Sequence, residues 1–428
     1  MKKERSESIM FFKEQYQQIK DFAEDIYHHP ELGYKEQRTK ENIIRFLKEV
    51  NPNIEIEHFS TTGFKTTLGP EDGGTHIAFI AELDAVYAPS HMYADKETGA
   101  AHNCGHYTQV AIALAVYRYY VKTNARRNWK NKITFVFVPA EEYLDLAYRD
   151  ELIEQGTITH YGGKPEAMKL GVFYDIDLAI CVHAIGGEFD NRTVNVNCDL
   201  AGFLYKKYTF KGKATHAGFD PFSSKNAYSM STVFNTAVGL MRQQLDEKEH
   251  VRINPIVMGS DMSTNVIPNE ITVGTDLRTK TVDYLKEAAA KLDDAARGSA
   301  IALQGEVAAH TQMGYLPFIQ DRYLSSFVQA VFKDFSEIDE IDDDSFISAA
   351  GDIGDLSYMI PCIQIGYSGF TGTIHGDDFI DVDPEFIYRI FPEFVAEVLE
   401  NIDKNVDKEK LYKRSYSEYL SVINQIVD

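Results

Sequence analysis

Cysteine is scarce in this chain of 428 residues, which has only Cys104, Cys181, Cys198 and Cys362. The four positions follow no dense spacing, so the sequence predicts no disulfide framework, and we expect reduced thiols. Cys181, Cys198 and Cys362 lie in apolar or strand-like runs, which is typical of small buried side chains. Cys104 differs from the other three because its neighbours in the sequence are polar.

Long apolar runs and excess positive charge are also missing. No window of about 18 apolar residues is present, so we expect no membrane span, and the N-terminal stretch M-K-K-E-R-S-E-S-I-M-F-F-K-E has no apolar segment of the kind that secretory signals contain. The 43 basic against 65 acidic residues give a net charge of −22, which argues against nucleic acid and membrane surfaces as partners. We therefore expect a cytoplasmic protein that acts on a small molecule.

Helical and strand-like patterns alternate along the first half of the chain. Apolar residues recur at helical spacing over residues 8–27, 36–50 and 107–122. Three almost continuously apolar runs, typical of strands buried on both faces, cover residues 75–85, 131–142 and 177–184. This alternation predicts an α/β fold whose ligand site lies beyond the carboxyl ends of the strands. The residues at those ends are Glu82, Asp84, Glu141, Glu142 and His183.

A different pattern begins near residue 200 and indicates an inserted domain. Its expected order is strand, helix, strand, strand, helix, strand, which is the split βαβ arrangement. The expected elements cover residues 204–216, 224–246, 253–259, 269–278, 282–297 and 300–310. We therefore expect a catalytic domain of residues 1–198 and 313–428 around an insert of residues 199–312. In the second catalytic segment we expect a helix over 322–334, a solvated acidic loop at 337–344 and a charged helix over 403–428.

Metal-binding residue types gather in the stretch G-A-A-H-N-C-G-H-Y, residues 99–107. Cys104 and His106 are separated by one glycine, so both side chains can face one ion, and thiolate with imidazole suits zinc and its first-row neighbours. His102 either joins them as a ligand or packs beside the loop. In another interpretation Cys104 is a nucleophile with His106 as its base, but neighbours two apart are poorly placed for proton transfer.

Other strand ends favour the metal interpretation. Glu141 and Glu142 follow a buried strand, where adjacent carboxylates repel each other unless a cation is near. His183 ends the next strand, and His375 lies in the glycine-rich stretch T-G-T-I-H-G. Each feature alone has a simpler explanation, such as a surface acid pair or a hydrogen-bonded histidine. Their coincidence at equivalent ends of one sheet predicts a metal site with one carboxylate as ligand and the other as general base.

Eight motifs together resemble one enzyme family. In chain order they are H-H-P-E-L-G-Y-K-E, A-E-L-D-A, H-N-C-G-H, V-P-A-E-E, V-H-A, G-K-A-T-H-A-G-F-D-P, T-N-V-I-P-N-E and T-I-H-G. Over roughly residues 20–390 the chain resembles the aminoacylase/carboxypeptidase-type dinuclear metallopeptidases, in the amidohydrolase branch of hippurate, auxin-conjugate and aminobenzoyl-glutamate hydrolases. The stretch G-D-I-G-D-L-S-Y-M-I-P is more similar to the aminobenzoyl-glutamate group. The resemblance implies an α/β catalytic domain with a ferredoxin-like lid or dimerisation insert.

The resemblance also implies a site with two divalent ions: zinc, manganese, cobalt or nickel. Cys104 would bridge the two ions, and the ligands of the two ions would be His106 with His183, and Glu142 with His375. Glu141 would be the general base, and Asp84 would orient a ligand. Position 82 holds Glu and position 107 holds Tyr, where the hippurate branch has Asp, so the substrate preference of that branch does not transfer directly.

Three residues of the insert complete the implied site. His216 would reach the active site across a dimer and stabilise the oxyanion, while Asn265 and Arg278, or one of them, would hold the carboxylate of the substrate. The simpler explanations are a turn-capping histidine, a turn asparagine and a surface arginine. The resemblance thus implies at least a homodimer.

The expected function is metal-dependent hydrolysis, by a metal-activated water, of the amide bond in a small N-acyl or aminobenzoyl amino acid or a short peptide. An alternative within the family is a dipeptidase or aminopeptidase, which needs an acidic anchor for a free amine, such as Glu188, Asp190 or Asp220. An alternative of another class is a nonenzymatic binding protein that kept the fold. The presence of Glu141 and all the implied ligands argues against that last alternative.

Overall fold

The computed structural model describes residues 2–70, 74–123, 125, 129–258 and 263–427, with side chains from residue 7 onward. It divides into two compact units. The first unit comprises Met1–Cys198, Ile319–Ser345 and Asp355–Tyr416, and the second comprises Asp199–Phe318, Phe346–Gly354 and Ser417–Asp428. Residues 313–318, 346–354 and 417–428, which we expected in the catalytic domain, are thus grouped with the insert.

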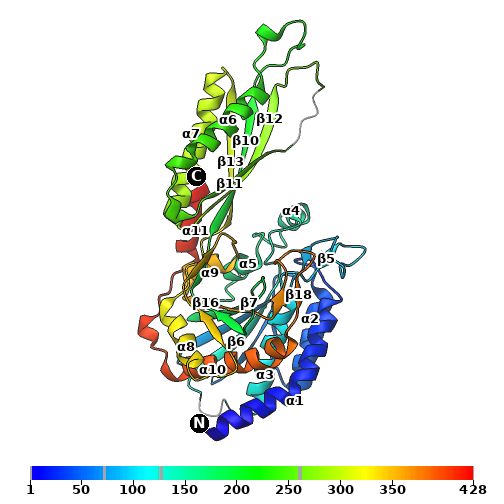
Figure 1. Cartoon of the computed structure of the whole chain (residues 1–428), viewed down its shortest axis with the longest axis vertical. Coiled ribbons are helices and arrows are strands. Elements are labelled where there is room, and N and C mark those ends of the chain that lie inside the picture. The colour runs from blue at the N-terminus through cyan, green and yellow to red at the C-terminus, as the bar shows by residue number, and fades with distance from the viewer. Residues whose placement is uncertain (1, 71–73, 124, 126–128, 259–262, 428) are drawn as a thin grey trace. The chain divides into compact units, whose positions relative to one another are not determined.

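A mixed sheet forms the centre of the first unit (Figure 1). Its strands are β1 (Glu57–Phe59), β2 (Gly63–Leu68), β3 (His76–Glu82), β6 (Lys132–Val138), β7 (Leu178–Ala184), β8 (Thr193–Asn195), β14 (Glu340–Asp342) and β16 (Cys362–Tyr367). They lie in the order β1-β2-β6-β3-β7-β16-β8-β14. β6, β3, β7 and β16 are parallel neighbours, so their carboxyl ends share one edge. Every residue of β3 is buried, as expected for a strand covered on both faces.

The helices of the first unit cover this sheet. They are α1 (Lys2–Tyr27), α2 (Gln37–Val50), α3 (His106–Lys122), α4 (Leu146–Glu154), α5 (Gly163–Lys169), α8 (Arg322–Phe332), α9 (Ile353–Met359), which begins at the boundary with the second unit, and α10 (Phe391–Asn405). α3 packs against β3 and β7 on one side and against α1, α2 and α10 on the other. Its first twelve residues are all buried, because a helix that is apolar all round has to lie inside the protein. This packing fixes His106, the first residue of α3, at the carboxyl edge of the sheet.

The second unit is a four-stranded antiparallel sheet with two long helices. Its elements are β10 (Gly202–Lys211), α6 (Ala227–Met241), β11 (Arg252–Val257), β12 (Glu270–Thr279), α7 (Val282–Ala302) and β13 (Glu306–Tyr315), followed near the end of the chain by α11 (Tyr416–Val427). The strands lie in the order β11-β12-β10-β13. Alternate residues of β10 are buried, since α6 and α7 cover one face of the sheet. The mixed α/β fold and the split βαβ order of the insert are therefore confirmed.

Short strands form the remaining pairs: β4 (Val86–Tyr87) with β5 (Ala100–Ala101), β9 (Cys198–Leu200) with β15 (Ser345–Ile347), and β17 (Phe370–Thr371) with β18 (Ile380–Asp381). Within the described ranges, no helix is both long enough and apolar enough to cross a membrane.

Three local predictions were wrong. Residues 300–302 end α7, and the last strand of the insert begins only at Glu306. The tail is not one helix, because α10 ends at Asn405 and α11 begins at Tyr416. The acidic stretch 337–344 is not only a loop, because it contains β14, which pairs in parallel with β8. Asn195 donates to a carboxylate oxygen of Asp342 at 2.6 Å, so the charged residues of this edge strand have side-chain partners.

Candidate metal centre

A tight turn before α3 brings Cys104 and His106 together. Gly105 between them has a φ of +84°, which is the left-handed region that glycine adopts most easily. A Cβ at this position would lie 2.7 Å from the Cβ of Ala184 on β7. The glycine of the C-G-H motif is therefore required both by the backbone conformation and by the close approach of β7.

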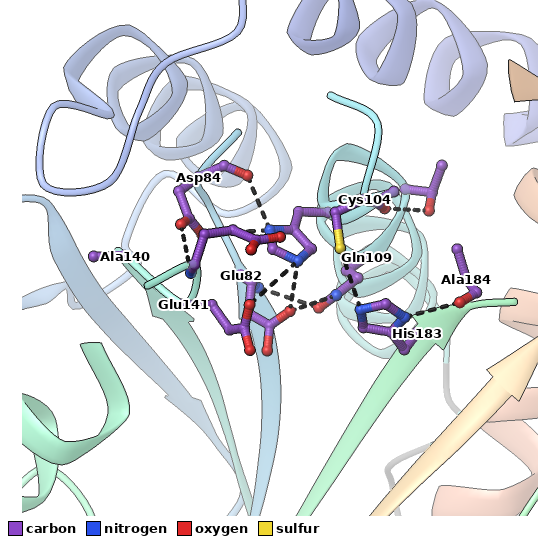
Figure 2. Close-up of polar contacts among 12 residues, drawn as sticks. Glu82, Asp84, Cys104, Gln109, Ala140, Glu141, His183 and Ala184 are labelled. Carbon is purple, nitrogen blue, oxygen red and sulfur yellow. Dashed lines mark hydrogen bonds and ion pairs between the residues drawn. The ribbon is translucent and has the colours of Figure 1, made fainter. Parts of the chain in front are cut away.

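The first group of donor atoms comes from Cys104, His106 and His183, whose ligand atoms all lie within 4.8 Å of one another. The Nδ1 atoms of His106 and His183 lie 2.9 and 2.8 Å from the carbonyl oxygens of Asp84 and Ala184. Because a carbonyl only accepts hydrogen bonds, each Nδ1 carries a proton, which leaves Nε2 as the ring nitrogen that can bind a cation. The Cys104 sulfur points toward His183, whose Nε2 is 3.6 Å away (Figure 2).

The second group comes from Cys104, Glu142 and His375, again within 4.8 Å of one another. Nε2 of His375 lies 2.9 Å from a carboxylate oxygen of Glu142. His375 has a φ of +67°, and its backbone N–H donates to the carbonyl of Asn103 at 2.8 Å. This bond ties the glycine-rich loop to the segment just before Cys104. The Cys104 sulfur is the one atom that both groups share.

These donors fit divalent cations. Burial and the nearby Glu142 carboxylate raise the pKa of the Cys104 thiol well above its usual range. Among the described residues, Nε2 of His106 is buried without a hydrogen-bond partner, and so is one carboxylate oxygen of Asp84. Buried lone pairs and negative charges that face one another are unfavourable unless a cation lies between them. Thiolate, imidazole and carboxylate together suit zinc and related first-row ions.

The loop after β6 separates its two carboxylates. Ala140 has a φ of +53°, and its N–H donates to Glu36 at 2.9 Å. The N–H of Glu142 donates to Asp84 at 3.0 Å, so Asp84 contacts both this loop and His106. As a result the Glu142 side chain is turned inward into the second donor group. The Glu141 side chain is 13% exposed, and its nearer carboxylate oxygen is 3.9 Å from Nε2 of His106.

Arg149 supports the same loop and was missed by the sequence analysis. Its guanidinium is buried in α4, where it donates to the backbone carbonyls of Glu142 and, at 2.7 Å, of Tyr161. Nothing in the local sequence distinguishes this arginine from the exposed charges on the same helix. Its importance follows only from the folded path of the chain.

Glu82 also contacts the first donor group, although the sequence analysis gave it no role. Its two carboxylate oxygens lie 2.5 Å from Nζ of Lys164 and 2.7 Å from Nε2 of Gln109. The second oxygen is 3.2 Å from Nε2 of His106. Burial raises the pKa of Glu82, but the ammonium of Lys164 and the nearby histidines lower it further, so the carboxyl is held ionised below its usual range. The sequence did contain a signal for Glu82, because an acid at the end of a buried strand requires a cation nearby.

His102 lies outside both donor groups. It is buried, and neither ring nitrogen has a hydrogen-bond partner in the described ranges. Burial lowers its pKa to about 3, and its ring packs 5.7 Å from that of Tyr107. The structure therefore favours the packing interpretation for this histidine.

The other predicted residues lie in the second unit. His216 and Asn265 are exposed and adjacent, since the N–H of Ala217 donates to the carbonyl of Asn265 at 2.8 Å. Arg278 is half-buried on β12. It donates twice to Asp276 at 3.0 Å and once to the carbonyl of Ser348 at 2.9 Å. The guanidinium thus has protein partners already, which a substrate carboxylate would have to displace.

Two donor groups that share one sulfur, at the carboxyl edge of a mixed α/β sheet, fit a metal-dependent hydrolase. The chain belongs to the peptidase family M20/M25/M40, whose profile matches residues 78–389. It is therefore a hydrolase of amide or peptide bonds.

Individual relatives are distant. An N-acetyldiaminopimelate deacetylase from Streptococcus uberis is 25% identical over 73% of this chain and 80% of its own length. A dinuclear metal-binding peptidase of family M20 from Bacillus subtilis superimposes with a TM-score of 0.74 at 18% identity, over 92% of this chain and all of the other. An aminobenzoyl-glutamate utilization protein from Klebsiella pneumoniae gives a TM-score of 0.64 at 15% identity, over 92% and 97% of the two chains. At these identities the solved structures establish the fold alone.

Proposed function

We propose that this enzyme cleaves the amide bond of a small N-acyl or aminobenzoyl amino acid, or of a short peptide, at a centre of two divalent cations. The observation that supports the proposal is the Cys104 sulfur, which belongs to both donor groups. His106 and His183 would complete one cation site, and Glu142 and His375 the other. The proposed division follows the two groups of donor atoms that share this sulfur.

Bound divalent cations supply a Lewis acid and lower the pKa of water to near neutrality. The protein supplies the proton transfers. Glu141, at the edge of the first donor group, accepts a proton from the attacking water and returns it to the leaving amine. Asp84 accepts from the N–H of Glu142 and lies 3.3 Å from Nδ1 of His106. It therefore acts as a positioning residue for one donor in each group.

The interpretation of Cys104 as a nucleophile is disfavoured. A nucleophilic cysteine needs a lowered thiol pKa, whereas burial raises the pKa of Cys104. This interpretation also leaves the contact between Glu142 and His375 without a purpose.

In our proposal the insert recognises the substrate. His216 from a second copy of the chain would donate to the oxyanion, and its neighbour Asn265 would hold the substrate carboxylate. Arg278 would join only by exchanging Asp276 for that carboxylate. We therefore propose a homodimer or higher homo-oligomer as the active form. We also propose the cytoplasm as its location, since Cys104 must stay reduced to act as a ligand.

A dipeptidase or aminopeptidase is the alternative activity. Glu188 and Asp190 are exposed, and the N–H of Asp220 donates to the carbonyl of His216 at 3.0 Å. Any of the three could anchor a free amine. The acyl-amino-acid activity is preferred because the metal-centre motifs resemble the amidohydrolase branch most closely.

A hydrolysis screen tests the proposal. The metal-free protein is reloaded with zinc, manganese, cobalt or nickel and given N-acyl amino acids, aminobenzoyl-glutamate and dipeptides. We expect turnover of an acyl or aminobenzoyl amino acid with at least one ion and none after chelation. Hydrolysis that survives chelation but is lost after thiol alkylation would contradict the proposal and favour a cysteine nucleophile. Turnover of dipeptides alone would favour the alternative activity.

A further inference from the structure

A buried lysine is paired with Glu82 beside the donor groups, and neither the proposed mechanism nor the family motifs use it. Lys164 is the second residue of α5 and is fully buried. Its Nζ lies 2.5 Å from Glu82, and both side chains are at most 4% exposed. Lysine is rarely buried completely without a partner of opposite charge, so this ion pair is a built feature of the site.

Lys164 connects the two segments that carry the donor groups. Its neighbour Gly163 donates to the carbonyl of Ala140, at 3.0 Å, on the loop that carries Glu142. A Cβ at Gly163 would overlap the carbonyl oxygen of Pro139, 1.6 Å away, so α5 is pressed directly against that loop. On its other side Lys164 holds Glu82, which contacts α3.

Glu82 binds α3 at Gln109 and approaches it again one turn earlier, at His106. Its carboxylate accepts from Nε2 of Gln109 at 2.7 Å, and its N–H donates to Oε1 of Gln109 at 3.2 Å. The same carboxylate oxygen lies 3.2 Å from Nε2 of His106, the nitrogen that faces the first donor group. Figure 2 shows the Glu82 carboxylate next to the Gln109 side chain.

Glu82 is also a potential competitor for the cation. Its carboxylate, His106 and Glu141 form a third group of donors within 4.8 Å of one another. Both of its oxygens, however, are engaged by Lys164 and Gln109. Without the ammonium, a buried carboxylate would be left with too little positive charge nearby, and a cation at His106 would be the strongest available partner.

We propose that Lys164 is a positioning residue of the metal centre: its ammonium holds the Glu82 carboxylate out of the coordination sphere, so that His106 remains a ligand to a cation shared with Cys104 and His183. The inference rests on the proposed two-cation site. It concerns the arrangement of the ligands and makes no assumption about the substrate.

Cobalt is a suitable probe because its absorption spectrum reports the number and type of its ligands. In Lys164→Met we expect a changed spectrum of the cobalt-loaded protein and loss of cobalt to a chelator about 10- to 100-fold faster. In Lys164→Met/Glu82→Gln, which removes both charges, we expect the wild-type spectrum and slower cobalt loss than in Lys164→Met. The matched control is Lys206→Met, which removes a lysine that is 2% exposed and paired with Asp293 at 2.8 Å in the second unit. It should lower Tm and leave the spectrum unchanged.

Several outcomes would overturn the inference. A wild-type spectrum and cobalt-loss rate in Lys164→Met would reduce the lysine to a structural role. Loss of one of two bound cobalt ions in Glu82→Gln would make Glu82 a ligand in the native protein. If Lys164→Met does not fold, Glu82→Gln is compared with the double variant instead. Cobalt retention that is no better in the double variant than in Glu82→Gln would contradict the inference. Failure of the wild-type protein to bind cobalt, zinc, manganese or nickel would instead contradict the proposed function itself.

Discussion

Glu141 and Glu142 are neighbours in the sequence, yet the fold gives their carboxylates different surroundings. Glu142 is buried and faces His375, while Glu141 stays partly exposed beside the first donor group. Asp84 produces this difference by fixing the backbone N–H of Glu142. Two identical side chains can therefore divide the tasks of ligand and base.

The division of tasks predicts opposite outcomes for two matched variants. Glu141→Gln should keep both metal ions and lower kcat by about 10²- to 10⁴-fold, because only proton transfer is lost. Glu142→Gln should lose metal from the second donor group. Metal content measured beside kcat/KM separates the two variants. Loss of metal in Glu141→Gln would assign Glu141 a ligand role instead.

Arg149 predicts a further effect at the residue scale. Lysine keeps the charge but lacks the planar fork that reaches two carbonyls at once. Arg149→Lys should therefore leave a buried acceptor unpaired, destabilise the first unit by about 1–3 kcal/mol, and lower kcat because the loop of Glu141 and Glu142 loosens. Thermal unfolding and steady-state kinetics check this. Wild-type values for both would show that the arginine does not position the loop.

At the scale of elements, the sequence predicted the strands and helices that have a regular apolar pattern. β3, β6 and β7 are apolar runs between polar ends, so their ends and the acids and histidines there were recognisable. β14 was missed because an edge strand with acidic residues has the charge pattern of a loop. The roles of Lys164 and Arg149 were missed because they depend on where α5 and α4 pack, and no local pattern records this.

The packing of α10 against α1 predicts a dependence of stability on pH. Burial raises the pKa of Glu393 to about 7, and Glu337 and Glu397 add to the effect while Ser8 opposes it. Because the pKa is raised in the folded state, its contribution to stability is present below about pH 4.5 and is lost as the pH rises toward 7.

Glu393→Gln should remove this loss. The stability of the variant relative to the wild type should increase by up to about 3 kcal/mol between pH 4.5 and pH 8. Denaturant unfolding at several pH values measures the change, with the exposed Glu409→Gln as the control. An equal slope in Glu393→Gln and wild type would show that Glu393 does not titrate in this range.

At the scale of the whole molecule, the proposed role of His216 requires two copies of the chain. His216→Ala should lower kcat/KM by about 10²- to 10³-fold with both metals retained, because one oxyanion donor is lost. The exposed His310→Ala on β13 is the control, and it should behave like the wild type.

Mixing two inactive variants tests whether His216 acts in trans. In a mixed dimer of His216→Ala and Glu141→Gln, one of the two sites combines an intact Glu141 with an intact His216 from the other chain. We expect activity to return on mixing after subunit exchange. Mixtures that stay inactive while dimers form would place His216 in the same chain as the site that it serves, or outside catalysis.

The division of the chain into two units also bears on protein engineering. The backbone passes from one unit to the other after Cys198, Phe318, Ser345, Gly354 and Tyr416. A fragment of residues 199–312 would therefore lack β13 from Met313 onward, the segment 346–354 and α11. A chimaera that borrows the insert of a relative therefore has to exchange all three segments of the second unit, which are residues 199–318, 346–354 and 417–428.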